Sequence, residues 1–248
     1  MGKTVRNFLV RVGYNLISKG LKLPEGVSEV TSNALKAIFL KDLLNRLKVN
    51  CVLDIGAHHG SYVMNLRRIG FKGYIYSFEP DPRSFDILSS NHYKDPLWKG
   101  FRIAVGSENT TLPFNMTDLS CLSSFLTPKS AEITGAKMVN VKRLDHVIED
   151  LLYPIENPRV FVKIDTQGYD LEVIKGASGC MEMIKGFQSE ISVVPVYENM
   201  PHYLEALQFY ESLGFALMNL FAVTRSPGYG NVVEYDCLMV KLQALSNG

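Results

Sequence analysis

From residue 49 onwards, short apolar runs alternate with stretches of helical periodicity. Short runs bounded by turn residues are typical of strands, whereas apolar positions three and four residues apart are typical of helices. Regular alternation of the two predicts a mostly parallel sheet with helices on both faces. The expected strands are Val49–Ile55, Tyr74–Phe78, Phe101–Val105, Val160–Ile164 and Phe187–Val194, and the expected helices are Ser61–Ile69, one capped by Asp81, Asp170–Lys175 and Pro201–Gly214.

Two sections depart from this alternation. Between Thr110 and Leu144, the runs Leu112–Met116 and Met138–Val141 predict short extra strands joined by a loop rich in serine and threonine. Near the C-terminus, two apolar runs flank the turn sequence at 226–230, which predicts a terminal hairpin.

Residues 1–48 precede the alternating pattern and predict a helical extension to a domain that spans residues 49–248. A break at Pro24-Glu25-Gly26 separates a first amphipathic helix from a second one over Thr31–Lys48. The first helix has basic residues away from its apolar face, so it either packs on its own domain or makes weak peripheral contact with an anionic membrane. Its apolar face consists of Val5, Phe8, Leu9, Val12 and Leu16.

Composition and charge narrow the classes of protein. The formal net charge of only +1 gives no electrostatic reason to expect a nucleic acid as partner, because nucleic-acid-binding proteins carry a basic stripe. The four cysteines are far apart, which indicates buried or incidental thiols in a reducing compartment. No apolar stretch is long enough to span a bilayer, and no signal peptide is evident. We therefore expect a cytoplasmic protein; the oligomeric state is left open.

The most informative stretch near the start of the sheet is Val52–Gly60, V-L-D-I-G-A-H-H-G. It predicts a strand, then a tight glycine turn, then a helix whose first N–H groups face a ligand. Glu79 ends the next strand, where an acid can accept both hydroxyls of an adenosine ribose. A dinucleotide turn needs G-x-G-x-x-G, but His58 stands at its second glycine, which disfavours NAD. The D-x-G-x-x-x-G spacing instead resembles motif I of S-adenosylmethionine-dependent methyltransferases.

A second stretch, Val160–Ala177, reads V-F-V-K-I-D-T-Q-G-Y-D-L-E-V-I-K-G-A. Asp165 follows a strand that is apolar enough to be buried on both faces. An acid there faces the crevice where open α/β sheets bind ligands, although it would also suit a helix cap.

From about Val49 to Lys241, the sequence resembles the FkbM family of S-adenosylmethionine-dependent O-methyltransferases. The resemblance rests on the Val160–Ala177 stretch together with D-I-G-A-H-H-G, F-E-P and the later L-E-A-L-Q-F-Y-E-S-L-G-F. The resemblance implies a Rossmann-like class I methyltransferase fold, whose seven-stranded sheet ends in an antiparallel hairpin. It also implies methylation of a hydroxyl on a small molecule or glycan, such as a sugar or polyketide. Gln167, where the family often has an acid, and the pair His58-His59 depart from the common pattern.

Carried over by position, the resemblance assigns the cofactor site. The two glycines of the turn shape it, Asp54 braces it, Glu79 holds the ribose, and Asp165 faces the methyl group. The full expected set is Asp54, Gly56, Ala57, His59, Gly60, Glu79, Pro80, Val105, Gly106, Ser123, Ser124 and Asp165.

Catalysis at a hydroxyl needs a base or a metal ion. Asp165 is the first candidate base, and Glu190 on the fifth expected strand is the second. If a divalent ion such as magnesium takes part, Asp165, Glu190 and Asp236 are its expected oxygen ligands. Two other functions stay open: a catalytically silent cofactor-binding or scaffold protein, and, less favoured, an NAD-dependent oxidoreductase.

Overall fold

The computed structural model describes residues 27–246, and their side chains from residue 32 to residue 245. The expected first helix lies outside these residues. The chain divides into two units between Phe39 and Leu40, a point that falls within helix α2 (Val27–Arg46). The first unit is described only through residues 27–39, which are helical. The boundary expected at residue 48 stays a prediction. Among the helices that the structure describes, none combines the length and apolarity needed to cross a bilayer.

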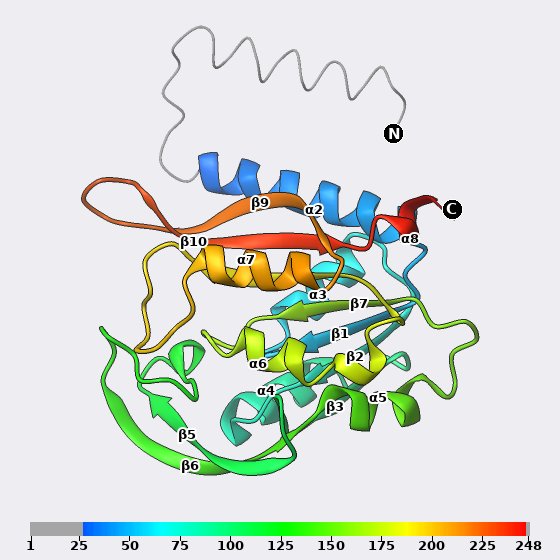
Figure 1. Ribbon diagram of the computed structural model, residues 1–248. Helices are drawn as coiled ribbons and strands as arrows, with labels where there is room; N and C mark the ends of the chain where they lie inside the picture. The colour runs from blue at the N-terminus through cyan, green and yellow to red at the C-terminus, as the bar shows by residue number, and fades with distance from the viewer. Residues whose placement is uncertain (1–26, 247–248) are drawn as a thin grey trace, which may run out of the picture. The chain divides into compact units, whose positions relative to one another are not determined.

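The second unit is built on a seven-stranded sheet of order β3-β2-β1-β7-β8-β10-β9. All its neighbouring pairs are parallel except β8–β10 and β10–β9. Figure 1 shows the reversal, since the arrows of β1 and β7 point left and that of β10 points right. This confirms the class I methyltransferase fold with its terminal hairpin. The strands are β1 (Cys51–Ile55), β2 (Tyr74–Phe78), β3 (Trp98–Phe101), β7 (Val160–Ile164), β8 (Ile184–Ser192), β9 (Ala216–Arg225) and β10 (Val232–Val240).

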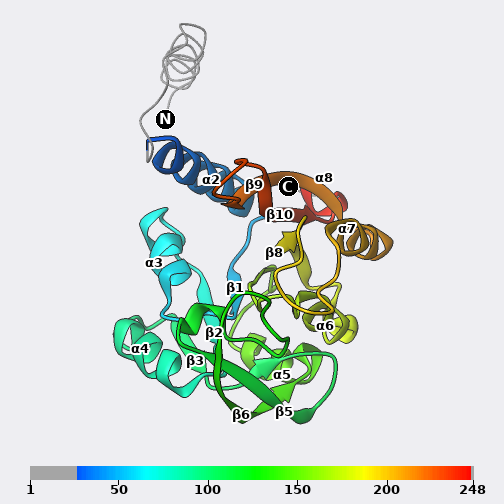
Figure 2. The same cartoon turned by 90° about the vertical axis from the view of Figure 1, so that its left-hand side faces the viewer.

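Helices cover both faces of this sheet, as the alternating pattern predicts. Figure 2 shows α3 and α4 on one side of β1 and β2, and α5, α6 and α7 on the other. Every residue of β1 and β7 is buried, which explains their nearly continuous apolar sequences. The helices are α3 (Ser61–Arg68), α4 (Pro82–His92), α5 (Leu144–Leu152), α6 (Asp170–Lys175), α7 (Tyr203–Ser212) and the short α8 (Gln243–Ser246).

Two expectations about the middle of the chain are corrected. The single strand expected over Phe101–Val105 is two: β3 ends at Phe101 in the main sheet, and β4 (Ala104–Val105) joins a second sheet of order β4-β6-β5. Apolar content alone cannot tell which sheet a residue pairs with. Helix α5 was not expected, although its buried residues recur at helical spacing.

The second sheet is an insertion between β3 and α5. It comprises β4, β5 (Thr110–Thr117) and β6 (Ile133–Lys142), and the loop between β5 and β6 contains the single-turn helix η1 (Ser120–Leu122). The two extra strands expected here are confirmed, and both are longer than expected. Phe114, Met116 and Val141 form a small core of their own within the insertion.

Candidate functional site

The carboxyl ends of β1, β2 and β7 meet at one edge of the sheet, because these strands are parallel neighbours. A cavity of about 270 Å³ opens there. Asp165 and Glu79 follow β7 and β2, so their carboxylates flank the turn after β1. The lining residues are Ile55, Gly56, Ala57, His58, Ser61, Tyr62, Phe78, Glu79, Pro80, Ala104, Val105, Phe114, Ser120, Cys121, Ser123, Phe125, Lys163, Asp165, Thr166 and Gln167.

The turn after β1 packs tightly against the neighbouring strand end. Gly56 has a φ of +78°, and a Cβ on it would lie 1.9 Å from the carbonyl oxygen of Asp165. Its N–H donates to the carbonyl of Phe78 at 3.0 Å. The glycine therefore lets β1, β2 and β7 converge at the floor of the cavity.

Substituting Gly56 by alanine is expected to lower the free energy of unfolding by at least about 3 kcal/mol more than the same change at Gly214. Gly214 is the matched control, since its φ is +83° and nothing lies within 4 Å of the Cβ position. Both variants lose stability because alanine disfavours the left-handed backbone, but only Gly56→Ala also forces the strand ends apart. Urea denaturation of the two variants measures the difference, and equal losses of stability would contradict this description of the turn.

Glu79 organises the side of the cavity that follows β2. Its Oε2 accepts the N–H of His58 and its Oε1 accepts the N–H of Asp81, both at 2.8 Å. Burial raises the pKa of this carboxyl to about 7, even though both hydrogen bonds act to lower it. Asp81 in turn caps α4 through the N–H of Arg83, which confirms the expected helix start.

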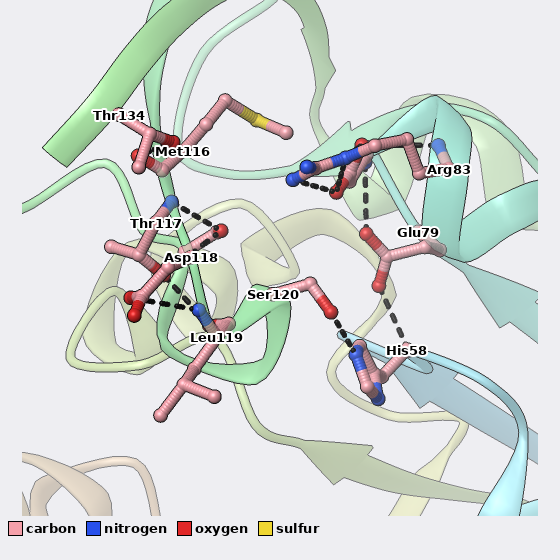
Figure 3. A network of polar contacts seen from close by, with 11 residues as sticks. His58, Glu79, Arg83, Met116, Thr117, Asp118, Leu119, Ser120 and Thr134 are labelled. Carbon is pink, nitrogen blue, oxygen red and sulfur yellow. Dashed lines mark hydrogen bonds and ion pairs between the residues drawn. The ribbon is translucent and has the colours of Figure 1, made fainter.

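His58 links this carboxylate to the insertion. Its backbone N–H bonds to Glu79, and its Nε2 lies 2.8 Å from the hydroxyl oxygen of Ser120 in η1 (Figure 3). The ring also stacks on His59 at a centroid distance of 3.7 Å. Burial, and then the neighbouring His59, lowers the pKa of His58, so the ring is neutral at physiological pH.

The side of the cavity next to β7 is charged. The Nζ of Lys163 lies 3.0 Å from Asp165 Oδ2 and 3.8 Å from Asp54 Oδ1. Asp54 is fully buried in β1, and burial raises its pKa despite the attraction of Lys163. The side chain of Asp165 is 38% exposed, so its carboxylate faces the open space.

Gln167 connects three loops around Asp165. Its Nε2 lies 2.8 Å from Asp165 Oδ1 and 3.3 Å from Glu190 Oε2, and its Oε1 accepts the hydroxyl of Tyr197 at 2.8 Å. Its backbone carbonyl accepts the hydroxyl of Ser124 at 2.8 Å. Gln167 has a φ of +53°, an uncommon backbone state for a residue other than glycine, and these contacts stabilise it.

The structure brings seven of the twelve expected cofactor residues to the cavity wall. The other five lie around it: Asp54 buried in β1, Gly60 at the start of α3, His59 stacked on His58, Gly106 against Val141 and Tyr169, and Ser124 on the carbonyl of Gln167. The seven at the wall are Gly56, Ala57, Glu79, Pro80, Val105, Ser123 and Asp165.

Glu190 and Asp236 lie away from the wall of this cavity. Glu190 lines a separate, much smaller cavity, and Asp236 is its partner across β8 and β10, where its carboxylate accepts Gln188 Nε2 at 2.9 Å. In the part of the chain that the structure describes, no three His, Cys, Asp or Glu side chains are grouped so as to hold a metal ion. The amide of Gln167 lies between Asp165 and Glu190, so these carboxylates and Asp236 are not gathered as the expected ligand set.

Two groups of cavity residues were not expected from the sequence. Lys163 is the only charged residue within the apolar strand β7. A lysine in a strand that is buried on both faces is unusual, and this could have identified Lys163 as a functional residue. Tyr62, Phe114 and Phe125 carry no comparable signal, because aromatic residues are common in any core.

The cavity matches S-adenosylmethionine in its distribution of chemistry. One part of its wall is apolar, with Phe78, Val105 and Phe125, and suits a purine. The Glu79 carboxylate suits a ribose diol, and the Lys163–Asp165 region suits a charged amino-acid end. The positive φ of Gly56 lets the backbone come close to a ligand. The residues present therefore fit this cofactor.

Comparisons with known proteins agree with this geometry. A family model described as the methyltransferase FkbM domain matches residues 54–217. The hexuronic acid methyltransferase AglP of Haloferax volcanii is 23% identical over 132 residues, which are 53% of this chain and 51% of AglP. The chain thus matches about half the length of this curated relative.

Solved structures with a similar fold include two proteins with bound S-adenosylmethionine. Aeropyrum pernix fibrillarin has a TM-score of 0.46 and 13% identity, with 84% of this chain and 74% of fibrillarin covered. Magnesium protoporphyrin IX methyltransferase from Synechocystis PCC 6803 has a TM-score of 0.47 and 10% identity, with 96% and 95% covered.

Proposed function

The chain belongs to the FkbM family of methyltransferases, and from this we propose that it transfers a methyl group from S-adenosylmethionine to a hydroxyl of a sugar or related polyhydroxylated acceptor. The observation that carries the proposal is the position of Asp165. Its carboxylate is 38% exposed at the charged part of the cavity, whereas Asp54 and Glu79 are buried. An exposed carboxylate beside the cofactor is placed to receive a proton from an acceptor hydroxyl.

The cofactor would lie with its adenine against Val105 and Phe125 and its ribose hydroxyls on Glu79. Each oxygen of that carboxylate already accepts one backbone N–H and has a second lone pair for a hydroxyl. Gly56 and Ala57 would pass close beneath the ligand, and Ser123 would approach it from the insertion. These assignments extend the expected cofactor residues to positions that line one cavity.

Affinity for the cofactor is expected to fall as the pH decreases through about 7. Ribose hydroxyls donate to the ionised form of Glu79, and the pKa of that carboxyl is about 7 before binding. Above about pH 8 the Kd should be constant, and well below pH 7 it should rise about tenfold per pH unit. Calorimetric titration of S-adenosylhomocysteine between about pH 5.5 and 8.5 measures this. Glu79→Gln is the control, whose weaker binding should not change with pH over this range; a pH-independent Kd for the unmodified protein would exclude Glu79 as the ribose acceptor.

When bound, S-adenosylmethionine supplies a methyl group made electrophilic by its sulfonium. The chain's own residues then have two tasks: to hold the acceptor oxygen in line with the methyl carbon and sulfur, and to take up its proton. Asp165 receives that proton as the oxygen–carbon bond forms and the carbon–sulfur bond breaks, with the electron pair of the broken bond left on sulfur. Gln167 and Lys163 hold the two oxygens of Asp165 in place for this transfer.

Glu190 has a supporting role in this proposal. Burial, followed by the charges of Asp165, Glu234 and Asp236, raises the pKa of Glu190 well above its usual value. Because the amide of Gln167 lies between the two carboxyl groups, Glu190 acts on the orientation of Asp165 and does not itself face the main cavity.

The relative AglP, a hexuronic acid methyltransferase, supports a sugar as the acceptor class. The test is incubation of the protein with labelled S-adenosylmethionine and a panel of neutral glycosides, amino sugars and uronic acids, with mass spectrometry of the products. We expect a methyl ether, which survives mild alkali. A product that mild alkali hydrolyses would instead be a methyl ester of a uronic acid carboxylate, and would contradict transfer to a hydroxyl. Binding of S-adenosylhomocysteine without transfer to any acceptor would favour a catalytically silent protein.

A further inference from the structure

Lys163 is the one cation at the wall of the cavity. Its residue is 8% exposed, and the residues that line the cavity, all within the described part of the chain, include no arginine and no second lysine. Burial alone would lower the pKa of Lys163, but Asp165 and Asp54 more than offset this and raise it. The side chain is therefore a buried ammonium held by two carboxylates.

The ammonium has three donors, and these two carboxylates leave at least one of them without an acceptor. Of its three N–H groups, one is directed to Asp165 Oδ2 at 3.0 Å and one faces Asp54 Oδ1 at 3.8 Å. The ring of Tyr62 lies 5.6 Å from Nζ on another side. The third N–H has no acceptor oxygen among the residues that the structure describes, and Nζ belongs to a residue of the cavity wall.

Two buried polar atoms in the side chains next to Lys163 also have no hydrogen-bond partner within the described part of the chain. They are Asp54 Oδ1, which lies 3.8 Å from Lys163 Nζ, and the hydroxyl of Tyr62, whose ring centroid lies 5.6 Å from Nζ. Native structures leave few buried polar groups unsatisfied, and such groups mark places where a ligand or water completes the network. The region around Lys163 is therefore an incomplete polar network at the wall of a cavity.

We propose that Lys163 binds the carboxylate of the methionine end of S-adenosylmethionine, and so determines that the site takes ligands with that carboxylate. This inference rests on the proposed function. A carboxylate buried in the cavity needs a charged or N–H partner. The pKa of His58 is lowered and Lys163 is the one lysine or arginine of the wall, so any rival partner there is an uncharged donor, such as the backbone N–H groups that begin α3. Asp54, which is buried 3.8 Å from the ammonium, acts as its fixed counter-ion.

The experiment compares two ligands on the unmodified protein and on variants. S-adenosylhomocysteine has the carboxylate, and its decarboxylated analogue keeps the ammonium and the nucleoside but lacks the carboxylate. We expect the unmodified protein to bind S-adenosylhomocysteine roughly 10- to 100-fold more tightly than the analogue, as measured by calorimetry. In Lys163→Met this preference should shrink to about threefold or less, through weaker binding of S-adenosylhomocysteine alone.

Lys175→Met is the matched control, because this lysine lies on α6, is about half exposed and pairs with Glu172 outside the cavity. Its ligand preference should equal that of the unmodified protein. Lys163→Met leaves Asp54 without its counter-ion, so the double variant Asp54→Asn with Lys163→Met provides a charge-balanced form for the same comparison. Circular dichroism and thermal unfolding verify that each variant is folded.

The outcomes separate this inference from the proposed function. If the unmodified protein does not bind S-adenosylhomocysteine, the proposed function fails. If it binds both ligands equally, or if the folded Lys163 variants keep the full preference, the carboxylate is held by the N–H groups of α3 or by none, and the role of Lys163 is overturned. A preference lost in both Lys163 variants and kept in Lys175→Met supports it.

Discussion

Replacing Glu79 by alanine is expected to raise the Kd for S-adenosylhomocysteine by about 10²- to 10⁴-fold. The substitution removes two hydrogen bonds from ribose hydroxyls to a charged acceptor, each of which contributes about 1.5–3 kcal/mol. It also leaves the N–H groups of His58 and Asp81 without the carboxylate that now accepts them at 2.8 Å. The turn after β1 and the start of α4 are then no longer joined through one carboxylate. Calorimetric titration measures the change.

Glu79→Gln sharpens this prediction. The amide of glutamine can accept at one oxygen only, so its NH₂ group would face one of the two backbone donors. Its binding should therefore also be weak, although its size matches the native side chain. Glu211→Gln, on the exposed surface of α7, is the control and should bind as the unmodified protein does. Retention of near-native affinity in Glu79→Ala would show that the ribose does not lie on this carboxylate.

Replacing Asp165 by asparagine is expected to lower kcat by about 10²- to 10⁴-fold. The loss follows from removal of the group that takes the acceptor's proton. The Kd for S-adenosylhomocysteine should change by less than about fivefold, because this carboxylate contacts Lys163 and Gln167 and does not hold the ribose. Rate measurements at saturating cofactor, together with calorimetry, separate the two effects.

Glu190→Gln is the comparison for Asp165→Asn. Glu190 lines a different, smaller cavity and is linked to Asp165 through the amide of Gln167, so its substitution should lower kcat less than that of Asp165. A larger effect at Glu190 than at Asp165 would reverse the two roles and place the base at the end of β8.

Much of the fold could be predicted from the sequence, because the elements that form it carry strong patterns. β2, β7 and α6 have the predicted bounds, since each is a short apolar or amphipathic run between clear turn residues. The region of β3 and β4 could not be predicted in the same way. Apolar residues continue through both strands, and only tertiary pairing assigns Phe101 to one sheet and Ala104 to the other.

The residues of the candidate site could likewise be predicted only where they follow a strand. Asp54, Glu79 and Asp165 follow strands at positions where an open α/β sheet binds its ligands, so their place in the chain predicts their place in space. The contacts of His58 with Ser120 and of Gln167 with Glu190 join segments that are 62 and 23 residues apart. No local pattern encodes such pairs, because they depend on how the insertion and the loop after β7 fold over the sheet.

A crystal structure of the protein with S-adenosylhomocysteine would show directly whether this cavity holds the cofactor in the proposed orientation. We expect the adenine against Val105 and Phe125, the ribose hydroxyls on Glu79, and the sulfur near Asp165, with the amino-acid end next to Lys163. Binding outside this cavity, or in the reverse orientation with the adenine beside Lys163, would contradict this expectation.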